Sequence, residues 1–170
     1  MYLLLIVAFS LVLFSCASQT PGPSQTPVPA SGATAFPAKL GVTQLSDGQK
    51  TWSGNDCRNK KLPFISIEKS EILPDSVPRG QEIRHRFVYV ACTSSDYGVL
   101  IGKLSRKISY KGMVKFPDTT EKFDIAPGKW EVNSIIVIPR AAEAGYYNLE
   151  LTLSGPKIQE VQRTTFKVQK

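Results

Sequence analysis

The chain has 170 residues, of which 42% are hydrophobic, and its formal net charge is +7 at pH 7. The excess of Lys and Arg over Asp and Glu predicts anionic neighbours, and solubility is the equal alternative. A single histidine excludes a metal site built on a pair of histidines.

The first segment, residues 1–15, has the composition of an export signal. Residues 2–14 are almost continuously apolar and contain no charged side chain. This run is shorter than the ~20 residues that a membrane-spanning helix needs, which favours the hydrophobic core of a signal peptide.

The signal segment ends in Leu13-Phe14-Ser15-Cys16, which resembles the lipobox of bacterial lipoproteins. The resemblance implies cleavage before Cys16 and acylation of Cys16, so that membrane lipid is a partner of the mature chain. In enterobacterial lipoproteins, aspartate after the cysteine retains the protein at the inner membrane, and positions 17 and 18 contain none. The resemblance therefore also implies lipid anchoring at the outer membrane, on its periplasmic face or at the cell surface.

The leader departs from the lipoprotein pattern in two respects. No Lys or Arg precedes the apolar run, and Phe14 is bulky where small residues are commoner. A start codon assigned too late would explain the first departure. The alternative interpretation is an ordinary signal peptide with an incidental cysteine.

Residues 16–40 are rich in Pro, Ser, Thr, Gly and Ala, and they carry no charge before Lys39. The segment has too little apolar surface to offset its ordering entropy, and its prolines favour an extended chain. We expect a disordered tether with a reach of at most ~70 Å. A spacer with no required length is the alternative.

Residues 41–170 are long enough for one domain with a sizeable core. Once Cys16 is acylated, Cys57 and Cys92 remain as an even pair in an oxidising compartment. We expect a disulfide between them, which stabilises by roughly 3–4 kcal/mol in the chain-entropy model. Two separate thiols are the alternative.

Short apolar alternations separated by Pro and Gly predict an all-β sandwich without long helices. Further strands are expected at 64–72, 98–104, 107–116, 123–125, 129–138 and 161–168. Gly102 and Gly112 are expected at bends or bulges.

The clearest predicted strand is 81–92. Its side chains on the face expected to lie in the core are Ile83, His85, Phe87, Tyr89 and Ala91. The opposite face changes from charged to apolar toward Cys92. Because apolar residues on an outer face need a cover, we expect the segment that carries Cys57 to provide it.

Residues 143–149, Glu-Ala-Gly-Tyr-Tyr-Asn-Leu, resemble the immunoglobulin-type corner Asp-x-Gly-x-Tyr-x-Cys. The resemblance implies an immunoglobulin-like or fibronectin-like antiparallel sandwich, in which the hydroxyl of Tyr147 bonds back to the preceding loop. The side chains that then face inward are Tyr147, Leu149, Leu151 and Leu153. Leu149 in place of Cys excludes the antibody-type disulfide. An ordinary amphipathic strand with Tyr and Leu in this order is the alternative.

The sequence contains none of the catalytic motifs that are recognisable from spacing, such as a nucleophile elbow or a phosphate-binding loop. His85 is expected to be a hydrogen-bonded core residue. Asp118, Glu121 and Asp124 lie among lysines, which favours a solvated turn over a calcium site. We therefore expect no enzyme, no cofactor and no metal.

The densest basic run contains Lys103, Arg106, Lys107, Lys111 and Lys115, with no acid between them. Alternation places Lys107 and Lys111 on an outer face, on middle strands at a sheet edge. Such a face suits an acidic protein, an anionic glycan or a lipid headgroup, whereas nucleic acid is not expected in this compartment. Lysines that only prevent edge-to-edge pairing of strands are the alternative.

Two functional hypotheses follow. The first is a membrane-anchored envelope lipoprotein whose immunoglobulin-like domain is a protein-binding or assembly accessory module. The second is a surface-displayed structural or adhesive protein that binds anionic glycans or filaments. The sequence does not indicate whether the protein forms oligomers.

Overall fold

The computed structural model of the chain describes residues 39–94 and 98–170. The predicted signal peptide, Cys16 and the linker up to residue 38 lie outside the described residues. The first strand, β1 (Lys39–Ser46), begins within the last part of the range predicted as linker.

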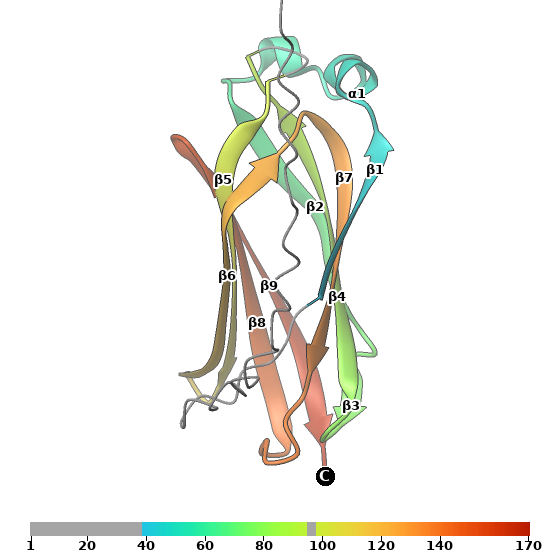
Figure 1. Cartoon of the computed structure of the whole chain (residues 1–170), viewed down its shortest axis with the longest axis vertical. Coiled ribbons are helices and arrows are strands. Elements are labelled where there is room, and N and C mark those ends of the chain that lie inside the picture. The colour runs from blue at the N-terminus through green and yellow to red at the C-terminus, as the bar shows by residue number, and fades with distance from the viewer. Residues whose placement is uncertain (1–38, 95–97) are drawn as a thin grey trace, which may run out of the picture. The chain divides into compact units, whose positions relative to one another are not determined.

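Nine strands form two facing sheets in the described part of the chain (Figure 1). The four-stranded sheet has the order β1–β7–β4–β2 and contains β2 (Phe64–Leu73), β4 (Glu82–Cys92) and β7 (Gly128–Val137). The five-stranded sheet has the order β3–β9–β8–β5–β6. Its strands are β3 (Ser76–Pro78), β5 (Leu100–Tyr110), β6 (Met113–Ile125), β8 (Gly145–Gly155) and β9 (Ile158–Gln169).

The strand order is that of an immunoglobulin-like sandwich, as predicted. Strands β2, β4 and β7 take the places of strands A, B and E in one sheet, and β5, β8 and β9 those of C, F and G in the other. Strand β6 extends the second sheet beside β5. Strand β1 takes the place of strand D, although it comes from the start of the domain. All pairs are antiparallel except β3 with β9.

The inward faces of β4 and β8 form the centre of the core, which confirms the alternation seen in the sequence. The five residues predicted to point inward from β4 are each at most 1% exposed. Tyr147, Leu149, Leu151 and Leu153 are buried on β8, and they belong to the same core cluster as Val132 and Ile136 of β7.

The strands predicted at 98–104 and 107–116 have the wrong bounds, because the observed strands are β5 and β6. Strand β5 runs without a break through Arg106, and the chain reverses at Lys111-Gly112 between paired Tyr110 and Met113. Both turn residues have positive φ, 49° and 77°, as a two-residue type I′ hairpin requires. The turn is not recognisable from the sequence, because Asn, Asp or Gly usually occupies the first of these positions and here it is a lysine.

Gly102 lies at a register shift between β5 and β6, which confirms the predicted bulge. A Cβ atom at this position would lie 2.4 Å from the carbonyl oxygen of Ser154. Only glycine therefore allows the backbones of β5 and β8 to approach this closely.

The segment before β2 covers the outer face of the four-stranded sheet beside Val90 and Cys92, as predicted. It contains the short helices α1 (Gly48–Gly54) and η1 (Cys57–Asn59). A disulfide joins Cys57 to Cys92 with 5.8 Å between their Cα atoms, and both cysteines pack with Val90 and Trp52 in a second small cluster. Within residues 39–94 and 98–170, neither helix has the length and hydropathy to cross a membrane.

Candidate functional site

The outer face of the five-stranded sheet carries the exposed part of the predicted basic run. Cross-strand pairing places Lys107 of β5 beside Glu150 of β8, and Glu150 beside Arg163 of β9. A shallow hollow on this face is lined by Lys103, Ser105, Lys107, Thr119, Glu150, Thr152, Ser154, Gln159, Val161 and Arg163. We call these residues the basic face.

The three cations of the basic face differ in their partners. Lys103 Nζ lies 2.7 Å from a carboxylate oxygen of Glu121, and Arg163 Nη2 lies 2.8 Å from one of Glu150. Lys107 is exposed and forms no ion pair with any described residue. Exposed ion pairs are weak, so all three cations remain available to a partner that carries negative charge.

Lys111 and Lys115 lie beyond the basic face, toward the β5–β6 turn. Lys111 is in the turn itself, with Nζ 3.7 Å from Glu143 and 4.9 Å from the centre of the Tyr110 ring. Its contact with Tyr110 raises the pKa of Lys111, and Glu143 adds to this effect. Lys115 is exposed at the bulge where β6 shifts register against β5.

Arg106 does not belong to this surface, which corrects the prediction that it contributes to an anion-binding face. Its parity on β5 is that of Leu104 and Ile108, so it points into the core and is 1% exposed. Its guanidinium forms an ion pair with Asp118 of β6. Burial lowers the pKa of Arg106, and the nearby Asp118 opposes this shift.

The acids 118, 121 and 124 lie along β6 and not in the solvated turn that the sequence suggests. Asp118 pairs with Arg106, and Glu121 pairs with Lys103. No group of three or more His, Cys, Asp or Glu side chains suited to a metal ion occurs within the described ranges.

His85 is buried in the core, as predicted. Its Nε2 lies 3.1 Å from the hydroxyl oxygen of Ser70. Burial lowers the pKa of His85 to about 3, and the charge of Arg106 acts in the same direction. The imidazole is therefore neutral at physiological pH, and no part of it is exposed.

Tyr146 is an exposed surface residue that the sequence analysis did not identify as a candidate site residue. Its side chain is 68% exposed on the outer face of β8. Lys167 Nζ lies 5.7 Å from the centre of its ring, and Asn148 and Thr165 form the next cross-strand pair on the same face. The signal in the sequence was the pair of adjacent tyrosines, of which only one can face inward.

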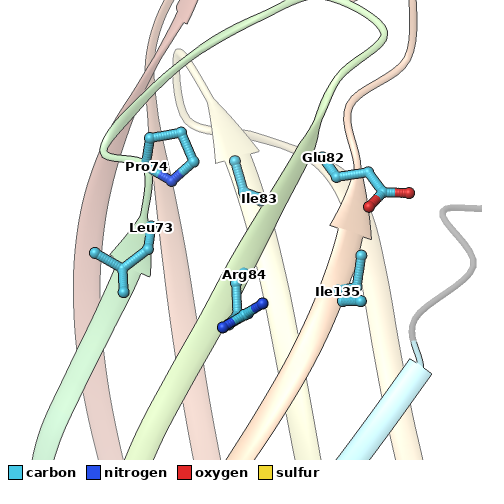
Figure 2. A pocket seen from close by; sticks show the side chains of 6 residues that line it. All are labelled: Leu73, Pro74, Glu82, Ile83, Arg84 and Ile135. Atoms are coloured by element: carbon cyan, nitrogen blue, oxygen red, sulfur yellow. The ribbon is translucent and has the colours of Figure 1, made fainter.

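A second hollow lies on the outer face of the four-stranded sheet, where β2 ends (Figure 2). Arg84 of β4 lies between the apolar side chains of Leu73 from β2 and Ile135 from β7. The neighbouring Arg86 pairs with glutamates of β2 and β7, whereas Arg84 forms no ion pair with any described residue. The sequence predicts a charged outer face at this end of β4, but it does not predict the apolar residues of β2 and β7 beside it.

The comparisons with known proteins give no functional family. No protein-family model matches the chain, and no curated protein matches it in sequence. Solved structures with a similar arrangement of strands include the alkylpurine DNA glycosylase AlkC of Pseudomonas fluorescens bound to DNA with an abasic site analog. The identity to AlkC is 10% and the TM-score is 0.47, with 62% of this chain and 30% of that one covered.

Two smaller proteins show comparable similarity. The sporulation control protein Spo0M of Bacillus subtilis has 10% identity and a TM-score of 0.44, over 62% of this chain and 49% of that one. The CARDB domain of the PF1109 protein of Pyrococcus furiosus, in complex with di-metal ions, has 16% identity and a TM-score of 0.44, over 63% and 89%. These similarities concern the fold alone.

Proposed function

We propose that the protein is an exported envelope lipoprotein, anchored through acylated Cys16, whose immunoglobulin-like domain is an assembly module that binds an acidic protein partner. The observation that carries the proposal is the basic face. It is accessible and rich in hydroxyl groups, and Lys107, in the row with Glu150 and Arg163, forms no ion pair with a described residue. The module binds and does not catalyse.

The chemistry of the basic face supports this role. Cations on a sheet attract an acidic surface over the screening distance of about 8–10 Å at ordinary ionic strength. The hydroxyl groups of Ser105, Thr152 and Ser154 then offer hydrogen bonds to polar groups of the partner. An extended tether after Cys16 would let the domain reach such a partner beyond the lipid headgroups.

The test is a double substitution, Lys103→Gln and Lys107→Gln, which removes two charges without placing a new acid beside Glu121. Recovery of acidic partners from solubilised envelopes should fall at least about tenfold at low salt, and high salt should have the same effect on the wild type. The matched control is Lys50→Gln with Lys170→Gln, which removes two exposed charges elsewhere. Equal recovery by both double variants at low salt would refute the proposal.

Tyr146 favours a second candidate function, the binding of an acidic glycan. An exposed tyrosine ring offers an apolar platform to a sugar ring, while Lys167, Asn148 and Thr165 offer charge and hydrogen bonds beside it. The probe is an oligomer of a uronic acid, titrated against its neutral counterpart. Under the glycan alternative Tyr146→Ala abolishes binding and Tyr146→Phe retains it, whereas under the protein-partner proposal the acidic and neutral oligomers both fail to bind.

A further inference from the structure

Two adjacent apolar side chains are exposed at the start of β6, next to the turn that joins it to β5. Met113 and Val114 are 55% and 56% exposed. Met113 pairs with Tyr110 and Val114 with Ser109, so the two apolar side chains lie on opposite faces of the hairpin. Large apolar residues exposed on both faces show that the tip of the hairpin extends beyond the core of the sandwich.

Lysines flank this apolar pair along the chain. Lys111, in the turn, has a side chain that is 67% exposed and lies 3.7 Å from Glu143. Lys115 is exposed at the bulge that follows, and it forms no ion pair with any described residue. Apolar side chains between long cations suit a lipid surface, because the apolar groups can enter the boundary of the acyl chains while the ammonium groups stay among the headgroups.

The whole end of the sandwich that carries this turn has a net positive charge. The turn lies at the same end as the β7–β8 loop, since the Tyr110 hydroxyl donates to the carbonyl of Ala144 (Figure 1). The pairing of β3 with the last residues of β9, and of Glu82 with Val137, brings further segments to this end. Its exposed charges in the described part of the chain are Arg79, Lys111, Lys115, Arg140 and Lys167, against Asp75, Glu82 and Glu143. This end therefore attracts an anionic surface.

The chain enters the domain from the same end. Strand β1 begins at Lys39, which pairs with Ile135 near the end of β7. Strand β7 runs toward the β7–β8 loop, and β1, which is antiparallel to β7, runs away from that loop. A lipid anchor before β1, as proposed for Cys16, is therefore compatible with an orientation in which the hairpin faces the membrane.

We propose that the tip of the β5–β6 hairpin is a membrane contact of the domain itself, which inserts Met113 and Val114 into the surface of an anionic bilayer while Lys111 and Lys115 bind its phosphate groups. A protein partner matches the tip less well, because apolar side chains on opposite faces present no single surface, whereas lipid can surround both. The contact is separate from the basic face, since Lys107 lies farther from the turn on β5.

The test uses the protein without residues 1–38. Both sheets and both core clusters are formed by residues 39–170, so this shortened chain keeps the complete sandwich. It has no Cys16, and the result is therefore independent of the proposed anchor. In flotation experiments it should bind vesicles that contain phosphatidylglycerol, lose this binding at high salt, and bind vesicles of phosphatidylcholine alone only weakly.

The lysines are tested by Lys111→Gln with Lys115→Gln. The partition coefficient on anionic vesicles should fall at least about tenfold, because each lysine near an anionic surface contributes roughly fivefold. The matched control is Lys50→Gln with Lys157→Gln, which removes two exposed charges at the opposite end of the sandwich and should leave binding nearly unchanged. Equal binding by the two double variants would overturn the proposal.

The apolar pair is tested by Met113→Ser with Val114→Ser, which should also weaken binding to anionic vesicles. The matched control is Val99→Ser with Ile101→Ser, because these side chains are 49% and 59% exposed at the other end of β5. Insertion is measured with Met113→Trp, whose fluorescence should be quenched by brominated phospholipid more strongly than that of the parent chain.

Three outcomes would overturn the membrane contact. They are the absence of binding by the parent chain to anionic vesicles, a Met113→Trp chain that binds without added quenching, and equal binding by the two serine variants. A protein captured from envelopes by the parent chain and lost with Met113→Ser and Val114→Ser, in the absence of vesicle binding, would overturn the proposal in favour of a protein contact.

Discussion

The rings of Tyr110 and Tyr147 stack with 4.6 Å between their centres, and both hydroxyls donate to the same loop. Tyr147 donates to the carbonyl of Glu143 at 2.9 Å, and Tyr110 donates to the carbonyl of Ala144 at 3.1 Å. The first bond is the predicted tyrosine corner. The second is an additional clamp from β5 that the corner pattern did not predict.

The tyrosine corner predicts that the hydroxyl groups of two adjacent tyrosines contribute differently to stability. Tyr147→Phe should lower the free energy of unfolding by about 0.5–1.5 kcal/mol, because it removes a hydrogen bond from a buried hydroxyl. Tyr146→Phe should change it by less, since the Tyr146 side chain is 68% exposed. Chemical denaturation of both variants measures the difference. Equal losses would show that the hydroxyl of Tyr147 does not stabilise the crossover.

The disulfide should contribute strongly to stability. Cys57 and Cys92 are 35 residues apart, and opening a loop of this size should cost roughly 3–4 kcal/mol by the chain-entropy model. The double variant Cys57→Ala with Cys92→Ala should therefore unfold at lower denaturant concentration. Mass spectrometry after alkylation under non-reducing conditions should find both cysteines protected in the wild type, and modification of both would exclude the bridge.

The proposed lipid anchor predicts a separation of membrane binding from folding. Cys16→Ala should abolish membrane association without changing the melting temperature, because Cys16 precedes every strand of the domain. Detergent phase partition of the wild type and the variant measures the first effect, and circular dichroism on heating measures the second. A variant that stays with the membrane after a high-salt wash would contradict the anchor.

His85 should make the domain less stable in acid. Its pKa is about 3 in the folded state and about 6.5 in an unfolded chain, so the unfolded state binds the proton first as the pH falls. The stabilising contribution is therefore complete above pH ~6.5 and is lost progressively down to pH ~3. Between pH 7 and pH 4 the loss should be roughly 2–4 kcal/mol.

The control for His85 is His85→Gln, which has no titrating ring. Urea unfolding of both proteins at pH 7 and pH 4 gives the difference that belongs to the histidine, because the carboxylates are common to both. A decline as steep in His85→Gln as in the wild type would assign the acid sensitivity to other groups.

Much of the sandwich could be predicted from the sequence because its signals are local. The alternation of apolar side chains along β4 defines its core face, and the spacing of Glu143, Gly145 and Tyr147 indicates the corner. The pairing of Cys57 with Cys92 followed from their number and from the expected compartment. The core face and the corner can be recognised from residues close together in the sequence, and the disulfide from the number of cysteines.

Part of the candidate site could be predicted in the same way. Lys107 lies on an accessible outer face, as alternation indicated, whereas Lys111, placed on the same face by alternation, lies in the β5–β6 turn. The prediction grouped Arg106 with these lysines because of its charge, although Arg106 points inward like Ile108 and is buried. Asp118 balances the charge of the buried Arg106. The two residues meet only because β5 and β6 form a hairpin, and the turn of that hairpin is not recognisable from the sequence.

The sequence by itself therefore determined the class of fold, the inward faces of its strands and the positions that carry charge. The tertiary structure decided which charges meet, since Lys103 with Glu121, Arg106 with Asp118 and Lys111 with Glu143 are each brought together by chain reversal. It also decided that β1 completes the sheet beside β7, far away in the sequence. The physical reason is that strand pairing and burial depend on the partner strand, and a single strand does not encode its neighbour.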